Sequence, residues 1–351
     1  MNRLSSPMFI DDSLVLEKAN RLPLDFIPYI EKVEWGFETG VRYLILNREP
    51  MLNSILPLAV FHLLRRNKQL IGTVMSLQKK ISLGNGDRVE ANYISLLSVL
   101  PAEQGHGHAK ALVQAADSEG KERKLNYAYI EDKNIPSAAV FKALGYERVG
   151  QFLATTFNRF VPKRSRDVAR LQPENTEFIK RQLSELYSNH AFLDLDASFH
   201  GDPYWVRMEN GKIIAGAQVE EEFWSITSMP GPDGWFALKV LPYFPLLNKI
   251  LNPKRLPIIK IANLYVAEGR EKEFMELISH LTCQYHKKLA LAYLDPRSLI
   301  YRRLRKTQWF GLFNSFFETP VNIWARFQGF NKAELAALKD RPFVISPLDI
   351  S

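Results

Sequence analysis

Residues 92–109 read NYISLLSVLPAEQGHGHA, and residues 134–147 read NIPSAAVFKALGYE. The first stretch is an apolar run that ends in a short loop with two glycines, and good helix formers continue through 109–123. The sequence therefore predicts a strand at 92–100, a glycine-bearing loop and a helix, then a strand at 125–130 and a short helix at 136–143. Such a βαβ crossover requires parallel pairing, so the predicted fold class is α/β with a mixed sheet.

The loop between the first strand and the helix suits an anion. Glycine permits a tight turn and close approach of a ligand, and the first turn of a helix leaves backbone N–H groups unpaired. The positive end of the helix dipole adds to these donors, so residues 104–109 predict a pyrophosphate site. His106 and His108 would add positive charge when protonated; the alternative is a pair of exposed loop histidines without a catalytic role.

A second motif follows about 25 residues later, with Asn134, Ala138, Phe141 and the run Leu144-Gly145-Tyr146-Glu147. Together the two motifs resemble the GCN5-related N-acetyltransferase (GNAT) superfamily. The matching features are its Gln/Arg-x-x-Gly-x-Gly/Ala loop and its later Asn, Ala, aromatic and Leu-Gly-Tyr/Phe-Glu positions. The clear match spans roughly residues 94–150.

This resemblance implies an acyl-CoA site, with acetyl-CoA as the co-substrate. Backbone N–H groups of the loop would hold the CoA pyrophosphate, and the strand near Leu97 and Val99 would run beside the pantetheine arm. A backbone N–H of that strand would also stabilise the oxyanion that forms when an amine attacks the thioester. The predicted CoA-binding residues are Leu97, Val99, Gln104, Gly105, His106, Gly107, His108, Ala109, Asn134 and Phe141.

The sequence defines the catalytic acid and base less clearly than it defines the CoA-binding residues. The family often has Tyr where this chain has Phe141, but a thiol with a pKa of about 8.5 is a tolerable leaving group unaided. An ammonium acceptor must lose a proton before it attacks. The strand 92–100 contains no acid, and Glu90 stands just before it. Glu90 and Asn134 are the predicted catalytic residues, with Glu131 and Asp132 as alternative bases.

The predicted function is direct transfer of an acetyl group from acetyl-CoA to an amine, on a small molecule or a peptide. The single cysteine, Cys283, excludes an intramolecular disulfide and a multi-cysteine zinc site, so no metal is expected. Two alternatives stay open. One is a non-catalytic protein that binds or senses acyl-CoA, and the other is an aminoacyl- or long-chain acyltransferase of the same fold.

The 351 residues suggest two domains. A polar connector at 162–167 and a constant offset of 166, which relates Gln104 to Arg270, Leu125 to Leu291 and Gly145 to Gly311, indicate duplication. The predicted organisation is a GNAT domain at 1–161, a degenerate GNAT-like domain at 162–330 and a tail at 331–351. In the second copy Glu273 and Met275 replace the two small loop residues, so that copy is not expected to bind CoA.

Other segments give further expectations. Gly84-Asn85-Gly86-Asp87 predicts a hairpin turn, residues 25–37 a helix, and residues 212–219 and 223–228 two paired strands.

The net charge of +8 suits a nucleotide cofactor as well as nucleic acid, and no nucleic-acid motif accompanies it. No membrane-spanning run or signal peptide is evident, so a cytoplasmic protein is expected. The oligomeric state is left open.

Overall fold

The structure is a computed structural model. It describes residues 8–9, 13–36, 40–84, 86–117, 123–158, 161–199, 202–229, 231–240, 243, 252–307 and 320–350. Gly311, one member of the offset pairs above, lies outside these residues.

The amino-terminal half is a strand-rich unit with short helices. Its elements are β1 (Met8–Phe9), β2 (Leu14–Ala19), α1 (Phe26–Ile30), β3 (Trp35–Gly36), β4 (Arg42–Leu46), α2 (Glu49–Ile55), β5 (Ala59–Arg66), β6 (Gln69–Ser82), β7 (Arg88–Val99), a 3-10 turn (Pro101–Glu103), α3 (His108–Ala116), β8 (Lys124–Glu131), α4 (Ile135–Ala143) and β9 (Glu147–Asn158).

The carboxy-terminal half repeats much of this order. Its elements are β10 (Val168–Arg170), α5 (Thr176–Leu186), α6 (Leu195–Ser198), β11 (Tyr204–Glu209), β12 (Lys212–Ser228), α7 (Gly231–Lys239), β13 (Leu256–Val266), α9 (Glu271–Gln284), β14 (Leu289–Leu294), α10 (Leu299–Lys306), β15 (Pro320–Gln328) and α12 (Lys332–Lys339); 3-10 turns cover Pro173–Asn175, Pro253–Arg255 and Pro347–Ile350.

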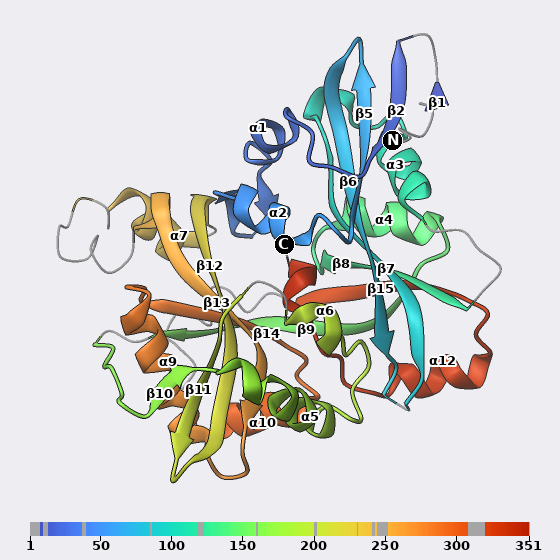
Figure 1. The fold of residues 1–351 in the computed structure, drawn as a ribbon. Helices are drawn as coiled ribbons and strands as arrows, with labels where there is room; N and C mark the ends of the chain where they lie inside the picture. Colours follow the sequence, from blue (N-terminus) through green and yellow to red (C-terminus); the bar gives the residue numbers. More distant parts are fainter. Residues whose placement is uncertain are drawn as a thin grey trace.

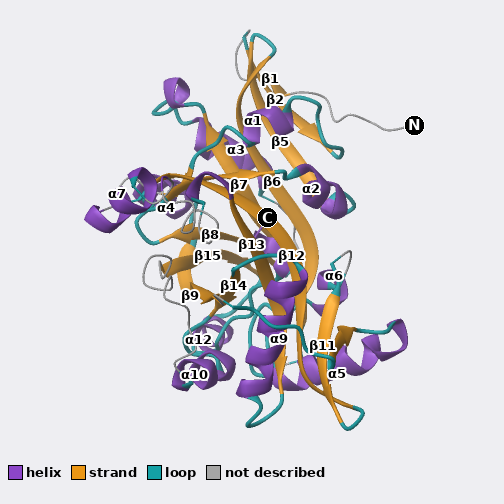
Figure 2. Cartoon of the chain, turned by 90° about the vertical axis from the view of Figure 1, so that its left-hand side faces the viewer, coloured by secondary structure: helices purple, strands orange, loops and turns teal. Residues whose placement is uncertain are grey.

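Within the described residues the strands form one 15-stranded mixed sheet that runs through both halves (Figure 1). Its order is β1-β2-β5-β6-β7-β8-β15-β9-β14-β13-β12-β11-β10, with β4 paired to β12 and β3 paired to β4. In each half one neighbouring pair is parallel, β7 with β8 and β13 with β14. Figure 2, turned by 90°, shows that the strands of the two halves continue into one another with helices around them.

The two halves exchange their last strands. β9 follows α4 in the first half but pairs with β14 of the second, and β15 follows α10 in the second half but pairs with β8 of the first. β9 and β15 pair with each other between them. Each half therefore completes the sheet of the other.

The repeat extends to a local backbone feature. Leu96 on β7 and Asn263 on β13 both have positive φ, 52° and 47°. Both lie just beyond the short parallel pairing of their strand, which covers Glu90–Ile94 on β7 and Ile258–Lys260 on β13. A bulge that re-aims the strand is thus present at the same place in each half.

The carboxy-terminal segment connects the halves through the core. Phe343 is buried in the cluster that contains Phe61, Tyr127 and Phe192, while its neighbour Val344 is buried in the core of the second half. The segment continues to Asp349, which is 1% exposed. In Figure 1 the end of the chain lies between the two halves.

Two sequence expectations are wrong in detail. The helix expected at 25–37 is α1, which ends at Ile30 and is followed by β3. The two strands expected within 212–228 are one strand, β12, that pairs with β11 and β13. The acidic run Glu220-Glu221-Glu222 does not interrupt it, because Lys260 pairs with Glu220 and Glu222 at 2.9 and 3.5 Å.

The helix after the glycine loop, the hairpin between β6 and β7, and the strand at 125–130 are confirmed. No helix among the described residues is long and apolar enough to cross a membrane. The same residues contain no group of three or more His, Cys, Asp or Glu side chains that could hold a metal ion.

Candidate functional site

The glycine loop forms an open cradle of backbone amides before α3. Gly105 and Gly107 both have φ of 81°, and nothing lies within 4 Å of a Cβ placed on either. Gly107 is the N-cap of α3 in the left-handed conformation. Within the described residues the backbone N–H groups of Gly105 to Ala109 donate no hydrogen bond. Unpaired donors at the positive end of a helix form a site for an anionic group.

Neighbouring side chains hold this cradle in place. The Nε2 of Gln104 donates to the carbonyl of Val99 at 3.1 Å, which fastens the loop to the end of β7. His108 is buried with its Nε2 3.6 Å from a carboxylate oxygen of Glu103, whereas His106 is exposed and stacks against His108. Of the two histidines, His108 lines the cavity described next.

Beyond Ile94 the parallel strands β7 and β8 separate. Their pairing covers Glu90–Ile94 and Lys124–Ala128 only. The bulge at Leu96 shifts the register of β7 against β6, so that Thr73 faces Ser98 and Met75 faces Ser95. Among the described residues, the edge of β7 that faces β8 therefore has no strand partner between the bulge and Val99, and an extended ligand can lie along it.

A cavity of about 740 Å³ begins at the cradle and passes between these strands. Leu97, Val99 and the loop line one part of it, and Asn134 and Phe141 line another. The Oδ1 of Asn134 accepts the backbone N–H of Ser137 at 3.2 Å and caps α4, which leaves its Nδ2 available. Phe141 is 2% exposed and packs edge-to-face on Tyr146. A cavity of this size is typical of ligand sites.

Glu131, the last residue of β8, lines the inner part of the cavity. Its Oε2 is buried and has no hydrogen-bond partner among the described residues. Burial raises the pKa of the Glu131 carboxyl to about 7. A carboxyl with this pKa is half ionised near neutral pH and suits acid–base chemistry.

The other acids of the lining differ from Glu131, because each has a basic partner. These pairs are Glu34 with Arg42 at 2.7 Å, Glu103 with Arg66 at 3.3 Å, Glu222 with Lys260 at 3.5 Å and Asp349 with Lys79 at 2.5 Å. Asp349 also accepts hydrogen bonds from Tyr127 and Tyr129 at 2.8 and 3.0 Å. These carboxylates are therefore occupied by cations, whereas Glu131 forms no ion pair within 4 Å among the described residues.

The two other acids considered from the sequence lie apart from the cavity. Glu90 is at the start of β7, at the end of the strand opposite the cradle, and pairs with Lys80 at 3.2 Å on the surface. Asp132 is exposed and accepts the Nδ2 of Asn322 at 2.9 Å. Neither belongs to the lining residues.

The inner end of the cavity is built by both halves. Tyr43 on β4 stacks on Trp224 of β12, with ring centroids 4.5 Å apart. Tyr293 of β14 and Arg48, the N-cap of α2, complete this chamber. Sequence reasoning missed all four residues, because they come from segments that no motif connects.

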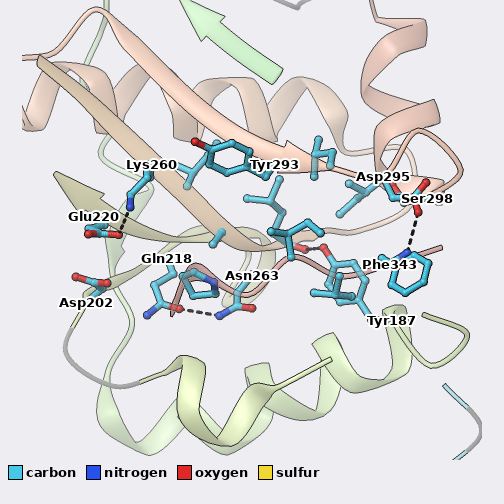
Figure 3. A pocket seen from close by; sticks show the side chains of 18 residues that line it. Tyr187, Asp202, Gln218, Glu220, Lys260, Asn263, Tyr293, Asp295, Ser298 and Phe343 are labelled. Carbon is cyan, nitrogen blue, oxygen red and sulfur yellow. Dashed lines mark hydrogen bonds and ion pairs between the residues drawn. The ribbon is translucent and has the colours of Figure 1, made fainter. Parts of the chain in front are cut away.

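The second half has a much smaller opening at the equivalent place. A cavity of about 40 Å³ lies beyond the pairing of β13 with β14, which is room for a few waters. Figure 3 shows Lys260 beside Glu220 and Gln218 beside Asn263. Phe343 of the carboxy-terminal segment lies on the side of this cavity opposite Lys260 and Glu220, and its backbone N–H donates to Asp295 at 2.9 Å.

The predicted loop of the second copy also differs from the cradle. Arg270 pairs with Glu273 at 2.9 Å, and Arg303 pairs with Glu271 at 2.5 Å, so ion pairs surround the start of α9. Met275 is buried in the core of the second half.

Comparison with known proteins agrees with these features. Residues 30–146 match the model of the Acetyltransferase (GNAT) family. N-myristoyltransferase of Saccharomyces cerevisiae, solved with bound myristoyl-CoA, shares the fold, with a TM-score of 0.62 and 10% identity over 97% of this chain and 92% of that chain. Another structure of the yeast enzyme, with myristoyl-CoA and inhibitors, has a TM-score of 0.61 and 10% identity over 97% and 89%. No curated protein matches the sequence.

The whole chain therefore has a fold of two GNAT-like halves. Residues 30–146 belong to the Acetyltransferase (GNAT) family. The predicted fold class and the predicted family are therefore confirmed. The domain boundaries at 161 and 330 and the assigned site residues remain predictions.

Proposed function

We propose that this protein transfers an acyl group from acyl-CoA directly to an amine, that acetyl-CoA is the donor, and that Glu131 is the general base. The observation that carries this proposal is one continuous cavity. It joins a cradle of unpaired backbone amides at Gly105–Ala109 to a buried carboxyl with a pKa of about 7.

The donor side follows from the cradle and the separated strands. The pyrophosphate of CoA would accept hydrogen bonds from the loop amides, and the pantetheine arm would lie between β7 and β8. The amide groups of that arm would pair with the backbone near Leu97 and Val99 as an added strand does. Asn134, through its free Nδ2, would contact the same arm.

The chemical step needs no covalent enzyme intermediate. Glu131 takes a proton from the ammonium acceptor, and the free amine attacks the thioester carbonyl carbon. A backbone N–H at the β7 bulge stabilises the resulting oxyanion. The C–S bond then breaks, and the attached nitrogen gives its second proton to the departing CoA thiolate, so that the neutral amide and the CoA thiol are released. The thiolate leaves without a tyrosine at position 141, because its pKa is far below that of an alcohol.

The second half would serve as one wall of the acceptor chamber and not as a second CoA site. Its own opening holds about 40 Å³ and is lined by the carboxy-terminal segment. Trp224 lines the cavity of the first half, and Tyr293 lines both cavities.

A longer acyl group is the second candidate for the donor. The fold is shared with a yeast enzyme whose structure holds myristoyl-CoA. Relative kcat/KM for a series of acyl-CoA donors, from acetyl to myristoyl, separates the two. The proposal of acetyl transfer is wrong if the longest donors are preferred.

Release of free CoA thiol from acetyl-CoA, measured with a broad panel of amines, tests the proposal. We expect release with at least one amine, and we expect Glu131→Gln to reduce kcat by roughly 100-fold or more. Glu90→Gln is the matched comparison, since it removes the base that the sequence favours but changes a surface ion pair outside the cavity.

Two outcomes contradict the proposal in different ways. Loss of activity in Glu90→Gln with normal activity in Glu131→Gln would reverse the assignment of the base. Tight CoA binding without thiol release for any amine or acyl donor would favour a non-catalytic acyl-CoA-binding protein.

A further inference from the structure

Arg48 is a buried cation in the inner chamber. It precedes α2 as its N-cap, is 3% exposed, and its guanidinium lies 5.4 Å from the centre of the Trp35 ring. The side chain belongs to the cavity lining. Its Nε and Nη1 are buried and have no hydrogen-bond partner among the described residues.

The other buried cations among the described residues have a carboxylate partner. Lys79 lies 2.5 Å from Asp349 and 3.5 Å from Asp194. Lys260 has two carboxylate partners in the same way, Glu220 and Glu222. In the part of the chain that the structure describes, Arg48 forms no ion pair within 4 Å. A buried guanidinium without partners is costly, so its retention at a cavity wall indicates an anionic ligand.

The carboxylate with the largest electrostatic effect on Arg48, Glu222, is already engaged. Glu222 contributes to the electrostatic environment of Arg48, and burial is the larger effect and lowers the pKa of Arg48. However, one oxygen of Glu222 accepts the indole N–H of Trp224 at 2.6 Å, and the other lies 3.5 Å from Lys260. The Nε and Nη1 of Arg48 are therefore without a protein partner among the described residues, at a residue that lines the cavity.

Arg48 and Glu131 face the same space from different elements. Arg48 comes from the start of α2 and Glu131 from the end of β8, and both line the one cavity. The hydroxyl of Tyr43 interacts electrostatically with both side chains, as well as with Glu222. One small molecule can therefore place an amine at Glu131 and an anion at Arg48.

We infer that the acceptor is an aminocarboxylic acid, such as a free amino acid, whose carboxylate is bound by Arg48 while its amine faces Glu131. A guanidinium presents parallel N–H donors that match the two oxygens of a carboxylate. The inference rests on the proposed N-acyl transfer and adds the substrate class to it. Arg48 then determines specificity, since it acts on the part of the acceptor that does not react.

The test compares each amino acid with the amine that lacks its carboxyl group. Suitable pairs are alanine with ethylamine, leucine with 3-methylbutylamine, and phenylalanine with 2-phenylethylamine, with acetyl-CoA as donor and CoA thiol as readout. We expect kcat/KM to be roughly 100-fold higher for at least one amino acid than for its matched amine. Comparable values for both members of every pair that reacts would overturn the inference and leave N-acyl transfer intact.

Substitution of Arg48 gives a second, independent test of the inference. Arg48→Met should lower the ratio of kcat/KM for an amino acid to kcat/KM for its matched amine by roughly 100-fold. Arg302→Met, an exposed arginine on α10, is the control and should not change this ratio. Equal loss for both members of a pair would show that Arg48 serves the structure and not recognition.

A binding measurement covers the case in which Arg48→Met does not fold. Calorimetry with the wild-type protein saturated with CoA should show binding of an amino acid and none of its matched amine at the same concentration. Arg48→Lys keeps the charge but loses the paired donors, so an intermediate affinity is expected. Absence of thiol release with every amine would instead contradict the proposed function itself.

Discussion

The ammonium group of Lys79 and the carboxylate of Asp349 form an ion pair of 2.5 Å in which both side chains are 1% exposed. The two residues are 270 positions apart in the sequence. Lys79 lies on β6, and Asp349 lies in the last turn of the chain, where Tyr127 also donates to it. The pair therefore fastens the end of the chain into the core of the first half, beside the cavity.

Removal of the Lys79 ammonium group should strongly destabilise the folded protein. Lys79→Met leaves Asp194 and Asp349 buried without a positive partner, and loss of one member of a buried pair typically costs about 3–5 kcal/mol. Urea unfolding of the full chain measures this loss. Lys80→Met on the same strand is the matched control, because its partner Glu90 is 48% exposed, and such surface pairs contribute at most about 1 kcal/mol. Equal effects would contradict the assigned role of the buried pair.

The cradle predicts that a side chain at Gly107 prevents CoA binding. Gly107→Glu would introduce bulk and negative charge beside the predicted pyrophosphate, as well as strain at a φ of 81°. Calorimetry should detect no CoA binding in this variant.

A matched control separates the strain from the charge. Gly211→Glu, in the turn between β11 and β12, has a φ of 76° and open space around it, so it introduces the same strain away from the cavity. This variant, like Glu273→Gly in the second half, should bind CoA with wild-type affinity. Unchanged binding in Gly107→Glu would refute the location of the site.

The pH dependence of turnover should report Glu131. Only its carboxylate form accepts a proton, and burial raises its pKa to about 7. The value of kcat/KM should therefore rise as the pH passes through about 7. The acceptor amine itself titrates at a higher pH and gives a second step. Glu131→Gln should remove the lower step and keep the higher one. A step near 7 that persists in this variant would assign the titration to another group.

The raised pKa of Glu131 also affects the free energy of unfolding, and the direction of this effect follows from the direction of the pKa shift. The pKa of Glu131 is raised from 4.5 to about 7, so the folded state binds the proton more tightly than the unfolded state does. The contribution of Glu131 to the free energy of unfolding should therefore decrease as the pH rises from 4.5 to about 7. At pH 8 Glu131→Gln should be more stable than the wild type, and the two should be similar near pH 4.

The sequence predicts well what local patterning determines. The loop around Gly105 and Gly107, the helix after it and the hairpin at 84–87 each depend on residues close in the chain, and the structure has all three. The acids at 220–222 show where such reasoning fails. Three charges in a row suggest a break, but Lys260 and Lys287 neutralise them across the sheet. Partners of this kind are visible only in three dimensions.

The inner chamber could not be predicted for the same reason. Arg48, Tyr43, Trp224 and Tyr293 are brought together by pairing of β4 with β12 and of β9 with β14. No motif spans these segments. Glu131 was one of several acids considered from the sequence. Its burial, its place in the cavity lining and the absence of a hydrogen-bond partner for its Oε2 among the described residues distinguish it from Glu90.

The exchange of β9 and β15 predicts that the two halves do not fold separately. A fragment of residues 1–161 lacks β15, so β8 loses its antiparallel neighbour and exposes backbone donors and acceptors at an edge. It also lacks Asp349, so Lys79 is left buried without a partner. We expect this fragment to show no cooperative thermal transition by circular dichroism. Co-expression with residues 162–351 should restore one transition, because the second fragment supplies both β15 and Asp349. A fragment that unfolds cooperatively by itself and binds CoA would show that the first half is an autonomous domain and that strand exchange is dispensable for its stability.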